Sequence, residues 1–223
     1  MTPLRPLLLL LVPFLFGIAA HAGDLPIKRI FSAPDLSGPS LRSARISPDA
    51  RRVTFLQGKA EDKDRLDLWE YELRSGKTRL LVDSRALVRN DAPLSDEEKQ
   101  RRERQRISAL SGIVEYLFAP DGKALLFPLG GDLFYYDLEA PADKAARQLT
   151  RTDAAETDAK FSPQGHFVSF VRGQNLIILD LRTNQERALT TDGGGVIKNG
   201  MVRPVNSSTM MTSPLRTMYS TSL

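Results

Sequence analysis

The sequence predicts an all-β protein, a partial β-propeller of about three four-stranded blades with a short charged helix inserted between blades one and two. One order of turns and strands occurs three times. Its second and third copies are 43 residues apart (Ala119 to Ser162), the length of a four-stranded propeller blade. The chain of 223 residues is 41% hydrophobic and 26% charged, which is a globular balance. A β-sandwich is the alternative fold, but the recurrent unit favours the propeller.

Each copy begins with a proline turn and continues into strands that alternate apolar and polar residues. In Pro120-Asp121-Gly122, proline presets φ for the turn and glycine takes a positive φ. Alternation such as Phe-Val-Ser-Phe-Val at 167–171 indicates half-buried strands. The motifs of the three copies lie at 45–49, 52–56, 67–71 and 76–81; at 118–122, 124–127, 131–137 and 147–150; and at 161–165, 167–171, 175–180 and 186–190.

The first two copies are 72 residues apart, which implies about 29 inserted residues between them. The polar stretch 59–65 is typical of a hairpin extension. The other insertion runs from Ser84 to about Ile107, where Ser95 and Glu98 have capping-box spacing with Ser95 as N-cap. Glu97 and Arg101 are four residues apart, as are Glu98 and Arg102, an order that supports a helix. We therefore expect a short charged helix that ends near Ile107, in its simplest interpretation a solvated surface helix.

Residues 1–22 have the pattern of an export signal. Arg5 gives a positive start, residues 7–19 form an apolar run, and Ala20-His21-Ala22 fits a cleavage site. A transmembrane anchor is the alternative, but a spanning helix needs roughly 20 apolar residues. The predicted protein is periplasmic or secreted, cleaved after Ala22, with no membrane contact after cleavage.

The composition removes several classes of chemistry. The chain has no cysteine and two histidines, His21 and His166, so disulfides, thiolate-bound zinc and cysteine nucleophiles are excluded. It also lacks the Gly-x-Ser-x-Gly turn of serine hydrolases. Three of the four net positive charges come from Arg5, Arg203 and Arg216, so the body is near neutral and gives no electrostatic case for nucleic acid. We expect no catalytic residue, no metal and no cofactor.

The last 23 residues differ from the rest. Residues 201–223 contain no acid and no strand alternation, and they hold four of the five methionines (Met201, Met210, Met211 and Met218). Three blades are fewer than the four to eight that close a propeller, so either partners complete the ring or the chain is a fragment; we favour the fragment. The predicted domains are a signal peptide at 1–22, the propeller part at 23–200 and an aberrant or disordered tail at 201–223. A frameshift near residue 200 is one explanation, and a natural tail is the other.

A combination of motifs resembles the N-terminal propeller of bacterial dipeptidyl peptidase IV, a prolyl oligopeptidase-type serine peptidase family. The resemblance covers roughly residues 24–200. It implies an eight-bladed propeller followed by an α/β-hydrolase domain that releases dipeptides after a penultimate proline or alanine. The motifs are Ile-Phe-Ser at 30–32, Leu-Ser-Gly-Pro at 36–39, Arg-Arg-Glu-Arg-Gln-Arg-Ile at 101–107, Gly-Ile-Val-Glu-Tyr at 112–116, Leu-Thr-Thr-Asp-Gly at 189–193 and Ile-Lys-Asn-Gly at 197–200.

The resemblance also implies site residues. In the family an arginine of the excursion between blades one and two contacts the substrate backbone; here it falls on Arg106, with Arg104 as the other register. A guanidinium can donate two hydrogen bonds in fixed geometry. The structural alternative is a surface arginine paired with Glu103 or Glu98. The family's glutamate pair, which binds the substrate ammonium, should follow Gly200 within about ten residues, where this sequence has no acid.

The predicted function follows from these points. We expect the truncated N-terminal propeller of an exported dipeptidyl peptidase IV-like exopeptidase, inactive as this chain because the amine anchor and the hydrolase triad are missing. The partners of the full-length parent would be the N-termini of peptide substrates. The family is often dimeric, so the parent could form a homodimer through surfaces mainly outside this chain. The alternative is a periplasmic interaction scaffold of TolB type, which needs no charged insertion at 101–106.

Overall fold

The computed structural model describes residues 25–32, 36–38, 40–59, 61–88, 93–94 and 96–200. The predicted signal peptide at 1–22 and the predicted tail at 201–223 therefore lie outside the described residues. Within these ranges, no helix has the length and apolar character needed to cross a membrane.

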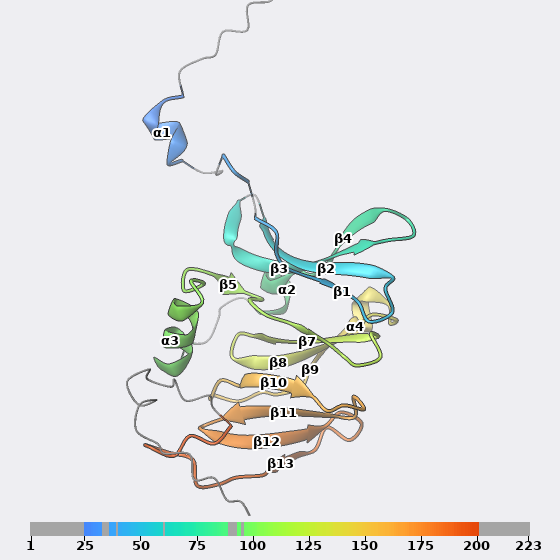
Figure 1. The fold of residues 1–223 in the computed structure, drawn as a ribbon, viewed down its shortest axis with the longest axis vertical. Helices are drawn as coiled ribbons and strands as arrows, with labels where there is room; N and C mark the ends of the chain where they lie inside the picture. Colours follow the sequence, from blue (N-terminus) through green and yellow to red (C-terminus); the bar gives the residue numbers. More distant parts are fainter. Residues whose placement is uncertain are drawn as a thin grey trace, which may run out of the picture.

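The described residues form three antiparallel sheets that follow one another along the chain (Figure 1). In each sheet four strands pair in chain order and form an antiparallel meander, and the first sheet has a fifth strand, β5 (Ser111–Gly112), which pairs in parallel with β3. This repeated unit is a propeller blade, and the predicted fold class, a partial β-propeller, is confirmed.

The first sheet contains β1 (Arg42–Ile46), β2 (Arg52–Lys59), β3 (Asp62–Glu72) and β4 (Lys77–Val82). The second contains β6 (Leu117–Phe118), β7 (Ala124–Leu129), β8 (Asp132–Asp137) and β9 (Ala146–Gln148). The third contains β10 (Thr157–Phe161), β11 (Phe167–Arg172), β12 (Asn175–Asp180) and β13 (Glu186–Ala188).

The repeated proline turns also pack against one another. Gly122 has a φ of 74°, and a Cβ at this position would lie 3.2 Å from Cδ of Pro48 in the preceding turn. Gly165 also has a φ of 74°, and its Cβ would lie 3.5 Å from Cδ of Pro120. The glycine of each turn thus accommodates both the left-handed backbone and the proline of the blade before it. The first turn has Ala50 with a φ of 52° at this position.

The core lies between the sheets, and the middle sheet is buried on both faces. Leu125 and Phe127 of β7 pack in a cluster with Leu56 of the first sheet. Leu126, between them, packs with Phe170 of the third sheet. A strand that is buried on both faces has a continuous apolar run in its sequence, which explains why β7 does not alternate between apolar and polar residues.

The insertion between the first two sheets contains three short elements. They are α2 (Ser84–Leu87), α3 (Asp96–Arg104) and β5 (Ser111–Gly112). The predicted charged helix is confirmed as α3, which ends three residues before the expected Ile107. The predicted extension at 59–65 is the far end of the β2–β3 hairpin, where Gly58 pairs with Leu66. Two further short helices are α1 (Ile27–Ile30) and α4 (Ala142–Ala145).

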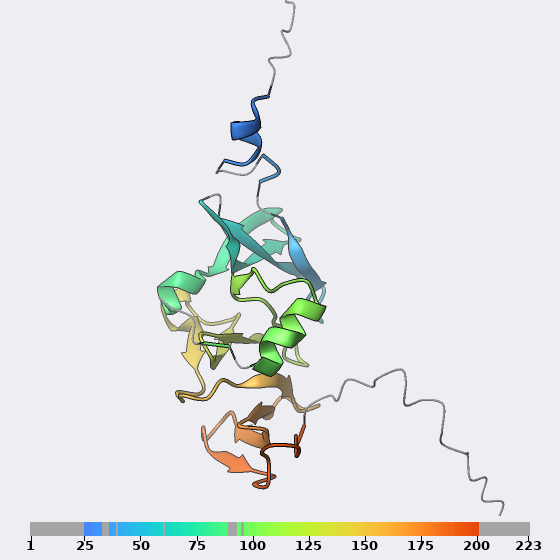
Figure 2. The same cartoon turned by 90° about the vertical axis from the view of Figure 1, so that its left-hand side faces the viewer.

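The sequence does not predict β5. This two-residue strand pairs in parallel with Arg65 and Leu66 of β3. These two residues precede Leu68, the first residue of β3 that pairs with β4. Gly112 has a φ of 71°, and a Cβ there would lie 2.5 Å from the Leu66 carbonyl oxygen. The close approach of the two backbones therefore requires glycine. Figure 2 shows that α3 lies in front of the sheets when the molecule is viewed from this side.

Candidate functional site

A buried carboxylate holds α3 together. The Glu98 side chain is only 7% exposed and accepts hydrogen bonds from Nε of Arg101 at 2.7 Å and from Nε of Arg102 at 2.8 Å. The expected Glu98–Arg102 pair is therefore present. The Glu97 side chain and the predicted cap Ser95 lie outside the described residues. Arg101, which was expected to pair with Glu97, takes Glu98 as one of its partners.

The same two arginines attach α3 to the chain that follows it. Arg101 also donates to both carboxylate oxygens of Glu115, at 2.9 and 3.1 Å. Arg102 donates from Nη1 to the Leu110 carbonyl at 3.2 Å. The hydrogen bond to Glu98, reinforced by Glu115, raises the pKa of the Arg101 guanidinium although burial opposes this. Both guanidinium groups are thus committed to holding the helix in place.

The helix ends in a motif that places Arg106 in a left-handed conformation. The amide of Arg106 donates to the Glu103 carbonyl at 3.0 Å, and the amide of Ile107 donates to the Arg102 carbonyl at 2.9 Å. This pair of bonds is the Schellman motif, whose left-handed residue is usually glycine. Here that residue is Arg106, with a φ of 57°. The Schellman motif is the reason why α3 ends three residues before the expected Ile107.

Arg104 and Arg106 differ from the two arginines before them. Both are exposed, and neither makes a side-chain hydrogen bond or ion pair with any residue the structure describes. Glu98, the partner considered for Arg106 from the sequence, is occupied by Arg101 and Arg102. The structure therefore places Arg104 at the last position of α3 and Arg106 two residues beyond it, with both side chains exposed.

The two ends of the insertion are anchored to the first blade. At its start, the Asp67 carboxylate accepts from the Ser84 amide at 2.8 Å, and Arg65 donates to the Val88 carbonyl at 2.8 Å. At its end, the buried Tyr116 hydroxyl donates to the Ser43 carbonyl at 2.7 Å and accepts from Oγ1 of Thr54 at 2.9 Å. Burial raises the pKa of Tyr116. The excursion thus begins and ends on rigid parts of the blade.

The remaining residues that the sequence singled out lie apart from this site. His166 lies in the turn before β11, and its side chain has no hydrogen-bond partner among the described residues. Asn199 donates from Nδ2 to Asp192 at 2.8 Å, and its amide donates to the Gln174 carbonyl at 3.0 Å. Gly200 follows with a φ of 71°. In the part of the chain that the structure covers, no group of three or more histidine, aspartate or glutamate residues could hold a metal.

Residues 119–211 match the model of the family described as the dipeptidyl peptidase IV (DPP IV) N-terminal region. This stretch of the chain is similar to the DPP IV N-terminal region. The family resemblance stated from the sequence is therefore confirmed. The match begins in the second blade, so α3 with Arg104 and Arg106 precedes it. The assignment of these two arginines to substrate stays a prediction.

Several solved structures of propeller-containing proteins are similar to this chain. They include the tricorn protease, with a TM-score of 0.44 and 15% identity over 68% of this chain and 13% of the other. TolB from Acinetobacter baumannii has a TM-score of 0.44 and 16% identity over 70% and 33%. Dipeptidyl peptidase 4 from Porphyromonas gingivalis has a TM-score of 0.42 and 20% identity over 68% and 20%. The chain spans about a third or less of each.

The roles of two residues that position α3, Glu98 and Glu115, could be predicted only in part from the sequence. Glu98 was found through its spacing from Arg102, but the spacing did not show that its carboxylate is buried and shared with Arg101. Glu115 lies in the family motif at 112–116, and nothing in its spacing predicts a contact with Arg101 across 14 residues of chain. A charged residue inside an otherwise apolar motif is the one signal that could have drawn attention to it.

Proposed function

We propose that this chain is the N-terminal propeller part of an exported DPP IV-like serine exopeptidase, and that Arg106 is its substrate-binding arginine. The signal-like pattern at 1–22 supports export, and the matched family supports the peptidase class. The observation that carries the role of Arg106 is its conformation: an exposed arginine without an ion pair among the described residues occupies the left-handed position at the end of a fixed helix.

Backbone conformation distinguishes Arg106 from Arg104. A residue with a Cβ in the left-handed region costs roughly 1–2 kcal/mol, which glycine at the same position would avoid. Arg104 is the last residue of α3, where the backbone is still helical and arginine is a good helix former. Unfavourable backbone geometry that persists at a surface position suggests a functional constraint. We therefore assign the substrate contact to Arg106 and keep Arg104 as the second register.

The chemistry required of this arginine is the recognition of an oxygen acceptor. A substrate backbone carbonyl or a terminal carboxylate accepts two N–H donors from one guanidinium in a planar arrangement. The clamp of Glu98 and Glu115 on the preceding arginines fixes the helix, so less conformational freedom is lost when Arg106 binds. A TolB-type scaffold would not need this charged helix.

Replacing Arg106 should weaken the binding of a short peptide at the end of α3. We expect the tripeptide Gly-Pro-Ala to shift the amide resonances of residues 103–107 of the 15N-labelled chain at about millimolar concentration. Loss of a charge-assisted hydrogen bond, about 1.5–3 kcal/mol, should weaken this binding at least tenfold in Arg106→Ala and in Arg106→Gly. The measurement is a two-dimensional NMR titration.

Arg106→Gly also separates function from structure. Glycine relieves the left-handed strain, so this variant should keep a free energy of unfolding within about 1 kcal/mol of the parent's while it loses the peptide. The matched control is Arg104→Ala. If Arg104→Ala lost the peptide and Arg106→Ala kept it, the other register would be correct. If neither variant changed binding, the scaffold function would be favoured.

We further propose that the 223-residue chain does not itself hydrolyse peptides. Serine peptidase chemistry needs a nucleophile, a base hydrogen-bonded to it and a group that orients the base. The only histidine after the signal-like segment is His166, whose side chain has no serine or carboxylate partner within the described ranges. We expect the purified chain to release no p-nitroaniline from Gly-Pro-p-nitroanilide above the rate of a His166→Ala variant. Turnover that disappeared in this variant would contradict the proposal.

A further inference from the structure

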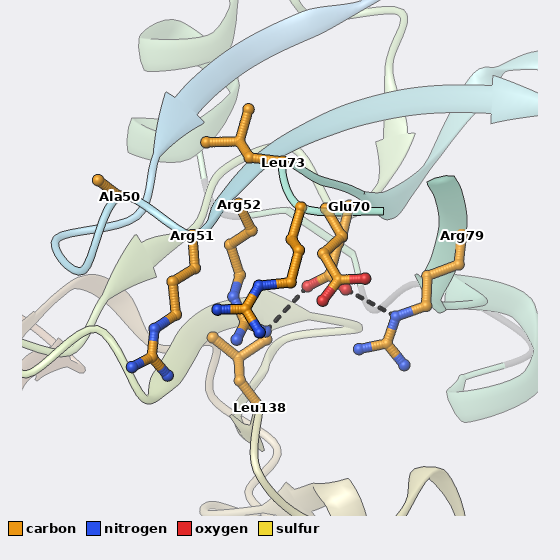
Figure 3. A pocket seen from close by; sticks show the side chains of 9 residues that line it. Ala50, Arg51, Arg52, Glu70, Leu73, Arg79 and Leu138 are labelled. Atoms are coloured by element: carbon orange, nitrogen blue, oxygen red, sulfur yellow. Dashed lines mark hydrogen bonds and ion pairs between the residues drawn. The ribbon is translucent and has the colours of Figure 1, made fainter. Parts of the chain in front are cut away.

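A hollow lies at the opposite end of the first blade from α3, and most of its charged lining residues are arginines. It has a volume of about 900 Å³ and lies next to Leu138, which follows the last residue of β8. Figure 3 shows the guanidinium groups of Arg51, Arg52 and Arg79 extending into the same space. The charged residues of the lining are Arg51, Arg52, Glu70, Glu72, Arg74 and Arg79. In Figure 1 this end carries the β3–β4 turn, and α3 lies on the other side.

One buried carboxylate holds two of these arginines in fixed positions. The Glu70 side chain is only 4% exposed; it accepts from Nη1 of Arg52 at 3.0 Å and from Nε of Arg79 at 2.7 Å. The hydrogen bond to Glu70 raises the pKa of Arg79, although burial opposes this. The Glu70 carboxylate is thus used internally, and each of the two guanidinium groups keeps further N–H donors.

The hollow keeps a positive excess after this pairing. Its lining contains four arginines and two glutamates, so it carries two net positive charges. Arg74 has no side-chain partner among the described residues, and Nε of Arg51 lies 3.7 Å from a carboxylate oxygen of Asp49. Nε of Arg52 is buried and has no hydrogen-bond acceptor among the described residues. A buried donor without an acceptor is unfavourable unless a ligand supplies one.

We propose that this hollow binds a ligand that carries two negative charges on its oxyanion groups, either a phosphate monoester or a dicarboxylate. Guanidinium groups recognise both kinds of oxyanion through paired N–H donors. Two charges on the ligand would neutralise the excess, and the volume is in the range of small-molecule sites. The Glu70 bridge orients Arg52 and Arg79 in advance, which reduces the entropy cost of binding.

The test is calorimetric titration of the full chain, at low salt, with inorganic phosphate in one arm and succinate in the other. We expect binding in at least one arm, and the arm that binds identifies the kind of ligand. The double variant Arg51→Ala, Arg74→Ala leaves the Glu70 bridge intact. It should weaken binding about a hundredfold, because each of the two guanidinium groups that it removes donates a charge-assisted hydrogen bond worth about tenfold in affinity.

The matched control is Arg187→Ala, an exposed arginine of β13 far from the hollow, which should bind as the parent does. Unchanged melting temperatures of all three proteins would show that the fold is intact. Binding should also weaken as salt is added. No heat of binding in either arm, or equal affinity of the parent and the double variant, would overturn the proposal.

Discussion

Phe127→Ala is expected to lower the free energy of unfolding by about 3–5 kcal/mol, the range for removal of a large buried aromatic side chain. Phe127 is 0% exposed at the centre of β7. Its ring stacks on Phe134 with 5.9 Å between centroids, and it packs in the cluster that joins the first two sheets. Alanine would leave a cavity between rigid sheets that can close only partly. Chemical unfolding followed by circular dichroism measures the destabilisation.

The control makes the same substitution where burial is small. Phe167 is 39% exposed at the start of β11, so Phe167→Ala should lower the free energy of unfolding by less than about 1 kcal/mol. Because about 3–5 kcal/mol is a large share of a typical domain's stability, Phe127→Leu provides a milder variant. A destabilisation at Phe127 no larger than that at Phe167 would show that the first two sheets do not share this core.

The strand pattern could be predicted because its causes are local. A turn such as Pro120-Asp121-Gly122 depends on the φ preferences of its own residues, and alternation depends on neighbours two residues apart. The bounds of the strands in the three blades could therefore be predicted nearly correctly from the sequence. The packing of Pro48 against Gly122 and of Pro120 against Gly165 gives the repeated motif a second role, which self-similarity alone does not reveal.

Features that depend on register between distant strands could not be predicted. Glu70 lies opposite Arg79 because of the β3–β4 register, and Arg52 reaches the same carboxylate from β2. No local rule places these three side chains in one hollow. The strand β5 has only two residues and exists because Gly112 allows a close approach to Leu66. The Schellman end of α3 was also not predicted, because Arg106 occupies a position that usually signals itself by glycine.

Glu98→Gln is expected to release α3 and to lower the free energy of unfolding by about 3 kcal/mol. Removing one partner of a buried ion pair leaves the other charges uncompensated and typically costs about 3–5 kcal/mol. The lower end applies because Arg101 would keep its bonds to Glu115. The peptide response at Arg106 should disappear at the same time, since the helix end would no longer be fixed. Unfolding curves and the Gly-Pro-Ala titration measure the two effects.

The control is Glu103→Gln, which makes the same change on the same helix. Glu103 is exposed and has no side-chain partner among the residues that the structure covers, so this variant should differ from the parent by less than about 0.5 kcal/mol. Hydrogen exchange separates local from global destabilisation: Glu98→Gln should reduce protection at 96–107 more than in β7 or β11. Equal behaviour of the two variants would refute the role of Glu98 as the residue that positions the arginines.

The acid dependence of this effect gives a further check on its electrostatic origin. Burial raises the pKa of Glu98, but the hydrogen bonds from Arg101 and Arg102 outweigh it, and the folded-state pKa lies below the ordinary value of 4.5. A carboxyl with a depressed folded-state pKa binds its proton more readily in the unfolded chain. The contribution of Glu98 to the free energy of unfolding is therefore complete at a pH above the ordinary pKa of 4.5. It declines as the pH falls from 4.5 through the lower pKa of the folded state. The stability difference between the parent and Glu98→Gln should thus be constant near neutral pH and shrink below about pH 4.5, whereas a purely steric effect of the substitution would persist unchanged in acid.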